Sequence, residues 1–528
     1  MASLFLRSCS RVLVAFALAA LIASTAQAEQ KVLRVAMHNA IRILDPHVST
    51  FFITRDFGYM IYDTLFALDE ELNVQPQMVN TWEVSEDQLT YTFHLRDGLK
   101  FHDGAPVTSE DVIASLRRWS SVDAMGQNLA SVTAEMKVVD ERTFRIILNE
   151  PYGLVLDSLG KAGANVPFIM PKRVAETPAS QQITETVGSG PFRFVAEEFQ
   201  PGVKAVFEKN SDYVPRDEPA SGLAGGKVVN IDRVEWVVFG DAQTIANALM
   251  AGEIDVWETP SYDHLPMLLA SGDIEVTVRA PLGNNNLLRL NWLQPPLDNV
   301  KIRQAILHAM DVEEFLASQV GDPEYYGVCG AIFGCGTPLA SDEGAVQVTG
   351  PHIERAKELL QEGGYQGEPI IVLMATKSVM MRPLGPVAAE ALRRIGMNVD
   401  LQTMDFTTVI QRSLNQGPIS EGGWHIFQTA QSAIDLMSPV GNSWVRGDGK
   451  QPGWPKDEVI EKLRDEYARS SDRERQKELA KEIQKRAYDL VFFIPNGQYI
   501  TPPAHKSFVK NWVISSPTVF WNLDIVQD

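Results

Sequence analysis

Two distant segments of the chain each predict a strand, a helix and a second strand. In the first, the strand VEWVVF (234–239) leads into a helical stretch that Asp241 caps and Gly252 ends, and a strand resumes at IDV. In the second, IIVLM (370–374) leads into a helical stretch that stops at Gly396, before the strand MNVDL. Such crossovers normally join neighbouring parallel strands. Because the two units are roughly 140 residues apart, they predict two α/β lobes, one in each half of the chain.

The N-terminus predicts export. Arg7 and Arg11 precede the apolar run VLVAFALAALIAS, and Ala26-Gln27-Ala28 is a small-x-small cleavage site. The run holds about a dozen residues, fewer than the roughly 20 that span a bilayer. We therefore expect residues 1–28 to be a signal peptide and the mature protein, starting near Glu29, to be soluble in the periplasm.

The three cysteines fit that compartment. Cys9 lies within the signal peptide, ahead of its apolar run, so it cannot be the acylated cysteine of a lipoprotein. Cys329 and Cys335 remain as an even pair and predict a disulfide that closes the short loop GVCGAIFGCG. Metal binding is the alternative, but two thiols without nearby histidines make a poor zinc site, so we expect no metal centre.

The net charge and the length of the chain limit its possible partners and its number of domains. The formal charge of −20 becomes −22 when the signal peptide is removed, because that segment holds two basic residues and no acids. Such an acidic surface disfavours nucleic acids and anionic membranes as partners. The mature length of about 500 residues exceeds what one core usually supports, so at least two domains are expected.

A charged stretch between Trp82 and Trp119 raises the question of catalysis, because it holds two histidines. Alternation places Tyr91, Phe93 and Leu95 on one face of a strand, which leaves His94 on the other. Asp97-Gly98 is a turn pair, and the faces mix across it, so we expect a bulge or a looser turn there. Thr108 is placed to cap a helix, with Asp111 three residues later. The stretch is therefore interpreted as scaffold, with neither His94 nor His102 catalytic.

No signature of catalysis appears elsewhere. The chain lacks the GxSxG elbow of a hydrolase, the HExxH metal motif and the GxxxxGK[ST] loop that cradles ATP phosphates. We expect a binding protein rather than an enzyme. A secreted α/β hydrolase is the remote alternative, because paired carboxylates have no fixed spacing by which to exclude them.

Five segments, taken in order, resemble one known family. They are TFHLRDGLKFHDGAPVTSEDV (92–112), GSGPFRF (188–194), VKIRQAILHAMD (300–311), AKELLQEGGY (356–365) and LRRIGMNVDL (392–401). Together they resemble the extracellular solute-binding proteins of the dipeptide, oligopeptide and nickel type, family 5, that serve ABC importers. The resemblance covers essentially the whole mature chain.

That resemblance implies an α/β fold, the two-lobed clamshell of a type II, peptide-binding-like periplasmic binding protein. Its larger lobe carries an extra subdomain. The implied boundaries place residues 29–70, 188–283 and 499–528 in lobe I, residues 71–187 in the extra subdomain and residues 284–498 in lobe II. Ligand lies between the lobes, which close around it by a hinge motion.

The implied function is capture of a peptide or peptide-like small molecule and its delivery to a membrane permease. ATP hydrolysis belongs to a partner subunit, no cofactor is needed, and the protein is expected to be a monomer. A non-peptide cargo stays open as an alternative: a metal chelate, an opine or a sugar-like compound.

Two segments carry the main candidates for ligand binding. Asn284 and Asn285 precede a strand at the expected crossover between lobes, although a simple turn is the alternative. Trp424 follows the flexible Gly422-Gly423 pair, and the family's corresponding tryptophan region lines the cleft; a packed core tryptophan is the alternative. The same segment continues through three further candidates, Phe427, Gln428 and Gln431.

The chain departs from the peptide-binding pattern just after this segment. In the family, an Asp there pairs with the ammonium group of the peptide. Our alignment places Ile434 at that position and Asp435 one residue later, so Asp435 is the candidate replacement. Arg412 could meet a carboxylate, although a surface arginine is the alternative. Lesser candidates, chosen because the resemblance places their segments near the ligand, are His38, Phe51 and Tyr152.

Overall fold

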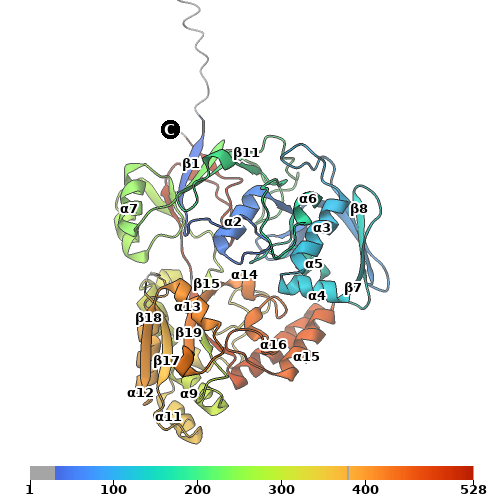
Figure 1. Cartoon of the computed structure of the whole chain (residues 1–528). Helices are drawn as coiled ribbons and strands as arrows, with labels where there is room; N and C mark the ends of the chain where they lie inside the picture. Colours follow the sequence, from blue (N-terminus) through green and yellow to red (C-terminus); the bar gives the residue numbers. More distant parts are fainter. Residues whose placement is uncertain (1–29, 377, 379, 527–528) are drawn as a thin grey trace, which may run out of the picture.

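The computed structural model describes residues 30–376, 378 and 380–526, so the expected signal peptide and Cys9 lie outside the described part. The described chain forms two α/β lobes, drawn one above the other in Figure 1, with a subdomain beside the upper one. Within the described residues, no helix has the length and apolar character needed to cross a membrane. The predicted fold class is therefore confirmed at the level of its lobes.

Lobe I is built on a seven-stranded sheet. Its strands, in spatial order, are β10 (Phe192–Phe194), β11 (Lys204–Lys209), β12 (Arg233–Val237), β1 (Val32–Ala36), β13 (Val256–Trp257), β21 (Ala504–Lys506) and β14 (Ile274–Val276). The first predicted crossover is present as α7 (Ala242–Ala251), which Asp241 caps and left-handed Gly252 ends. Its two strands are not neighbours, however, because β1 inserts between β12 and β13 and pairs in parallel with both.

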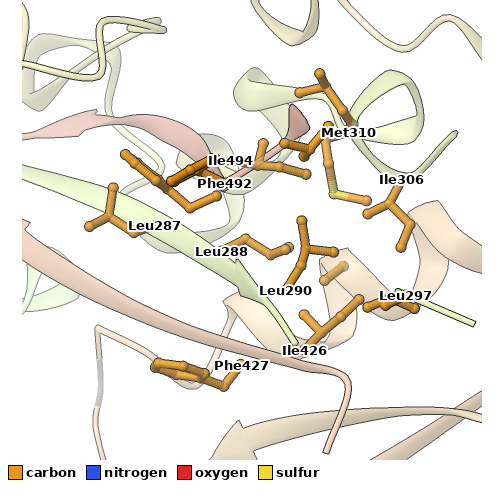
Figure 2. Close-up of a cluster of buried hydrophobic side chains, with 14 of the residues drawn as sticks. Leu287, Leu288, Leu290, Leu297, Ile306, Met310, Ile426, Phe427, Phe492 and Ile494 are labelled. Atoms are coloured by element: carbon orange, nitrogen blue, oxygen red, sulfur yellow. The ribbon is translucent and has the colours of Figure 1, made fainter. Parts of the chain in front are cut away.

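Lobe II is built on a six-stranded sheet. Its strands, in spatial order, are β16 (Tyr326–Gly327), β20 (Phe493–Tyr499), β15 (Asn284–Leu290), β19 (Ile426–Ser432), β17 (Ile370–Ala375) and β18 (Val399–Met404). The second predicted crossover joins neighbouring parallel strands, β17 and β18, through α12 (Leu384–Arg394). Figure 2 shows the core under this sheet, where Leu288 and Leu290 of β15 pack with Ile306 and Met310.

The helices of lobe II bury their apolar faces, with one exception at a helix start. Ile302 and Ile306 are buried in one helix and Ile483 in another, whereas Val459 is 44% exposed at the start of its helix. The principal helices are α9 (Val300–Ala309), α10 (Val312–Gln319), α11 (Ile353–Glu362), α13 (Phe406–Ser413), α15 (Glu458–Arg469) and α16 (Arg473–Leu490).

The subdomain of lobe I carries a four-stranded antiparallel sheet. Its strands, in order, are β5 (Val79–Val84), β6 (Thr90–Leu95), β8 (Thr143–Leu148) and β7 (Thr133–Val138). Thr108 and Asp111 form the predicted capping box of α3 (Ser109–Ser120). His94 bonds Thr143 and His102 bonds the carbonyl of Gly190, which agrees with a scaffold role. After the turn at Asp97-Gly98 there is no second strand of a hairpin, only an isolated bridge from Lys100 to Pro106.

The subdomain and lobe II share one apolar core, which we call the seam. On the subdomain side it includes Leu129, next to α5 (Val155–Leu159), and on the lobe II side Tyr467 of α15 and Leu479 of α16. The Gly153 N–H donates to the Ala468 carbonyl at 2.8 Å. In Figure 1 this contact lies where α4 (Ala124–Val132) and α5 approach α15 and α16. The two lobes are therefore joined by packing as well as by the chain crossovers.

The predicted disulfide between Cys329 and Cys335 is present, with Cα atoms 6.0 Å apart. It lies in the loop after β16, beside the crossover strands, because Gln498 of β20 donates to the Cys335 carbonyl.

Candidate functional site

A cavity of about 800 Å³ lies between the lobes. On its lobe I side it receives the residues that follow three parallel strands: His38 after β1, Phe239 after β12 and Glu258 after β13. In open α/β sheets, ligands bind outside the carboxyl ends of the strands. The size is also that of a small-molecule site, about 300–1,000 Å³. This interlobe cavity is the candidate binding site.

His38 and Glu258 form the first charged pair of the cavity. Glu258 Oε2 accepts from both the backbone N–H of His38 and its ring Nδ1, each at 2.8 Å, and Oε1 accepts from the Thr518 hydroxyl at 2.5 Å. Burial by itself raises the pKa of Glu258, but the charge of His38 and these hydrogen bonds lower that pKa to about 2. Burial lowers the pKa of His38, and the charge and hydrogen bond of Glu258 outweigh it and raise the pKa above 6.5.

Arg55 and Asp56 form the second pair, on α2 (Phe52–Ile61). Both side chains are buried, and Arg55 Nε and Nη2 each lie 3.0 Å from the same carboxylate oxygen, Asp56 Oδ1. The guanidinium also stacks on Phe52, 4.6 Å from the ring centroid. Burial raises the pKa of Asp56 above its ordinary value, against the opposing charge of Arg55.

Arg279, after β14 (Ile274–Val276), is the third cation at the cavity. It is 3% exposed, stacks on Trp512 at 4.1 Å and donates to the Val513 carbonyl and the Thr518 hydroxyl, both at 3.2 Å. Burial lowers the pKa of Arg279 to about 10, so it still carries its charge near neutral pH.

The lobe II wall of the cavity is mainly neutral. Asn284 comes from the start of β15, Ala430 and Ser432 come from the end of β19, and Thr407 lies in the first turn of α13. The Ser432 hydroxyl also hydrogen-bonds the hydroxyl of Ser516 of lobe I at 2.8 Å, directly across the cleft. The charged groups that converge on the cavity therefore belong chiefly to lobe I.

One triad in the cavity has the donors for a cation. The ligand atoms of His38, Asp56 and Glu258 lie within 4.8 Å of one another. However, His38 already bonds Glu258 and Arg55 already bonds Asp56, and the guanidinium groups of Arg55 and Arg279 oppose a second cation nearby. The arrangement suits organic charged groups better than a bare metal ion.

Of the residues predicted from the sequence, His38 and Asn284 line the cavity together. Three others lie in the core of lobe II. Trp424 is fully buried and packs on Phe427 with ring centroids 5.0 Å apart, and Gln428 is buried with its amide donating to the Leu384 carbonyl. The tryptophan thus occupies the packed position that the sequence left open as its alternative.

The remaining candidates are dispersed. Asn285 is buried beside Asn284, Gln431 is half-buried on β19, and Tyr152 belongs to the core of the subdomain. Phe51 is 62% exposed, just before the cavity-lining Phe52. Arg412 donates to the carbonyls of Gly422 and Gly423 and so braces a loop of lobe II.

Asp435 lies between the lobes but outside the interlobe cavity. It lines a separate cavity of about 490 Å³ beside the seam, with Lys161 and Arg473. Its Oδ1 accepts the backbone N–H of Ala164 at 2.6 Å, and a Cβ on Gly163 would lie only 2.0 Å from that oxygen. The carboxylate is therefore held by a loop of the subdomain.

Sequence reasoning missed Arg55, Asp56, Glu258 and Arg279. A signal was present for two regions. Glu258 follows directly on the strand IDVW, at the edge where ligands bind such sheets, and Arg55-Asp56 interrupts an otherwise apolar helical stretch, FITRDFGYMIY. Charged residues in an apolar stretch are seldom buried without a partner or a task.

Comparisons with known proteins agree with this geometry. Residues 73–452 match the family described as bacterial extracellular solute-binding proteins, family 5 Middle. The chain is 38% identical over 506 residues to the probable peptide ABC transporter periplasmic-binding protein y4tO of Sinorhizobium fredii, covering 95% of this chain and 94% of that protein.

Two solved structures share the fold. DppA of Helicobacter pylori, in complex with the peptide STSA, superposes with a TM-score of 0.78 at 21% identity, covering 94% of this chain and 98% of that chain. AgaA of A. tumefaciens R10, in complex with agropinic acid, superposes with a TM-score of 0.76 at 22% identity, covering 94% of this chain and 99% of that chain.

Proposed function

The chain belongs to the bacterial extracellular solute-binding proteins of family 5, and we propose that it captures a peptide or peptide-like small molecule for an ABC importer. The observation that carries the proposal is the interlobe cavity, where His38, Glu258, Arg55 and Asp56 converge at the carboxyl ends of parallel strands. The relative y4tO is named a probable peptide ABC transporter periplasmic-binding protein. Because it aligns over 94% of its length, it supports the same cargo class.

The mechanism is reversible binding rather than turnover. Closing the lobes removes water from the cavity, and the lower local dielectric strengthens the few charge contacts that remain. A receptor of micromolar affinity needs about −8 kcal/mol. Paired charges on lobe I and hydrogen-bonding groups on lobe II, such as Asn284, supply such contacts without covalent chemistry.

The cellular setting follows the family. We propose that residues 1–28 direct export and are removed, that the mature chain is a free periplasmic monomer, and that it delivers its cargo to a permease driven by a separate ATPase. The chain is proposed to have no enzymatic activity and to use no cofactor. We propose that the lobes meet near residues 283–284, where β15 begins, and near residues 498–499, at the end of β20.

A non-peptide cargo of similar size, such as an opine, is the second candidate. It is favoured by the position of Asp435, which is held by the Ala164 N–H rather than lining the cavity. The family's usual contact for a peptide ammonium is therefore missing from the expected place.

Native mass spectrometry of the mature protein, purified gently from periplasm, tests the proposal. We expect one small-molecule adduct per chain that is released on unfolding and identified as a peptide. A released opine or sugar would replace the peptide assignment. A protein that stays empty after incubation with a mixture of short peptides, with no change in its melting temperature, would contradict it.

A further inference from the structure

The acidic groups around the interlobe cavity differ in how far their hydrogen-bonding capacity is used. Glu258 has both oxygens engaged, by His38 and Thr518. Asp241 and Asp405 each cap a helix, and each uses one oxygen for a backbone N–H and the other for a threonine hydroxyl. These three carboxylates need nothing from a ligand.

Asp56 is different. It is 1% exposed, and both contacts from Arg55 go to its Oδ1, so Oδ2 has no hydrogen-bond partner among the described residues. Arg55 is 4% exposed, and its Nη1 likewise has no partner there. A buried pair with one free acceptor and one free donor is costly unless a further group satisfies both. Both residues line the cavity.

The charges around the pair are balanced, so its free atoms define the further group. The charge of Asp56, which lies 3.0 Å away, raises the pKa of Arg55 against the effect of burial, which lowers it. His38 and Glu258 form a pair of their own. Arg279 lies at the same cavity and its charge also interacts with that of Asp56, so the pair lacks not a net charge but one donor for Asp56 Oδ2 and one acceptor for Arg55 Nη1.

We propose that the Arg55–Asp56 pair of lobe I binds the free amino terminus of the ligand. Asp56 Oδ2 accepts from the ligand's ammonium group, and Arg55 Nη1 donates to the carbonyl or carboxylate oxygen on the neighbouring carbon. This inference rests on the proposed function and deepens it: the ammonium contact lies on lobe I at α2, whereas Asp435 is held by the loop of the subdomain.

The arrangement defines a ligand class. An α-ammonium group next to a carbonyl oxygen presents a donor and an acceptor side by side, which matches one free acceptor and one free donor held on a single side-chain pair. Peptides with a free N-terminus have this head, and so do amino acids linked through their side chains. N-acylated peptides and neutral sugars lack it.

The experiment compares two probe mixtures on the refolded, ligand-free mature protein. One is a random mixture of di- to pentapeptides, and the other is the same mixture with every amino terminus acetylated. Binding is measured by competition in native mass spectrometry. We expect the acetylated mixture to bind about 100-fold more weakly, because acetylation removes the charge and leaves Asp56 Oδ2 buried and unpaired.

Asp56→Asn tests the residue, and Asp63→Asn is the matched control. Asp63 also forms a buried ion pair in lobe I, with Lys227 at 2.7 Å and both side chains 1% exposed, but it does not line the cavity. We expect the preference for free over acetylated peptides to fall below about fivefold in Asp56→Asn and to persist in Asp63→Asn. The wild-type comparison stands even if a variant folds poorly.

The outcomes distinguish the ammonium contact at Asp56 from the peptide-receptor function. Equal binding of both mixtures by the wild-type protein, or an unchanged preference in Asp56→Asn, would overturn the inference while leaving the peptide receptor in place. If neither mixture binds the wild-type protein, both the inference and the peptide-receptor function are overturned.

Discussion

Two of the contacts between the lobes differ in chemistry. At the interlobe cavity, charged and hydroxyl groups face an open space of about 800 Å³, and the Ser432–Ser516 hydrogen bond links the lobes directly across it. At the seam, Leu479 and Tyr467 of lobe II pack into the apolar core of the subdomain, and Tyr467 also lines the smaller cavity of about 490 Å³ beside this contact. The difference teaches that one molecule separates two tasks, specific recognition at one contact and cohesion of its parts at the other.

The two contacts contribute differently to the free energy of folding. Apolar burial contributes about 25 cal/mol per Å² and does not depend on the ligand. Buried charges that lack partners contribute little or oppose folding until a ligand pairs with them. Substitutions at the seam should therefore change stability at every pH, and substitutions at the cavity should change binding or make stability depend on pH.

The largest effect is expected at the seam. Leu479→Ala removes a fully buried side chain from α16 and should lower the free energy of unfolding by about 3 kcal/mol, because of the lost burial and the cavity left behind. Urea unfolding, followed by circular dichroism, measures this. Leu414→Ala, at a leucine that is 62% exposed, should stay within about 0.5 kcal/mol. Similar losses in both variants would show that the seam does not hold the lobes together.

The His38–Glu258 pair should give the cavity a pH-dependent contribution that the seam lacks. The pKa of Glu258 falls from 4.5 to about 2 on folding, so its stabilisation is present above pH 4.5 and is lost as pH falls toward 2. The pKa of His38 is raised above 6.5, so its stabilisation is present below pH 6.5 and is lost as pH rises through the folded value.

The contact is therefore strongest between pH 4.5 and 6.5. Glu258→Gln should cost on the order of 2 kcal/mol at pH 5.5 and clearly less at pH 9. Thermal unfolding at the two pH values checks this, and Leu479→Ala serves as the control whose cost should not change with pH. A cost that is the same at both values would contradict the charge assignment.

A smaller effect is expected at Gly163, which lies at the boundary between the two contacts. A Cβ there would approach Asp435 Oδ1 to 2.0 Å, so Gly163→Ala should hold the subdomain loop away from lobe II and disfavour closure. We expect about tenfold weaker binding of the natural cargo, or about 1.4 kcal/mol, measured by calorimetry. Gly327→Ala, where nothing lies within 4 Å of the added carbon, should bind normally. Unchanged affinity in Gly163→Ala would mean that the loop does not take part in closure.

The smallest effect is expected from Ser432→Ala, which deletes the hydroxyl bond across the cleft. A net contribution of about 1 kcal/mol predicts two- to fivefold weaker binding and an unchanged melting temperature without ligand. Ser131→Ala, at an exposed serine of α4, is the control. A large loss of stability without ligand would show instead that this bond stabilises the fold, as the seam does.

Local chemistry made much of the fold predictable. Asp241 and Gly252 bound α7, and Thr108 and Asp111 cap α3, because caps are satisfied within a few residues of chain. The position of β1 between β12 and β13 was not predictable in this way, because it depends on pairing between strands about 200 residues apart.

The residues of the binding site were harder to predict from the sequence than the helices and strands. His38 and Asn284 line the interlobe cavity as expected, but Trp424 fills the core of lobe II, because a tryptophan after a glycine pair suits either place. The pairing of His38 with Glu258 joins residues 220 positions apart, and the burial of the adjacent Arg55 and Asp56 at the same cavity depends on where α2 packs. Only the carboxyl-end position of Glu258 was visible in the pattern of strands.

The seam lies at one side of the molecule, so opening of the lobes displaces the two sides unequally. If the seam holds while the lobes part, each segment is displaced in proportion to its distance from the seam. In Figure 1, α7 and α13 both lie to the left of α5 and α16, away from the seam. A pair of fluorophores on α7 and α13 would then register cargo capture as a large change in energy transfer, whereas the same pair on α5 and α16 would register almost none. The pair on α7 and α13 would thus report binding, and the pair on α5 and α16 would serve as its reference in the same protein.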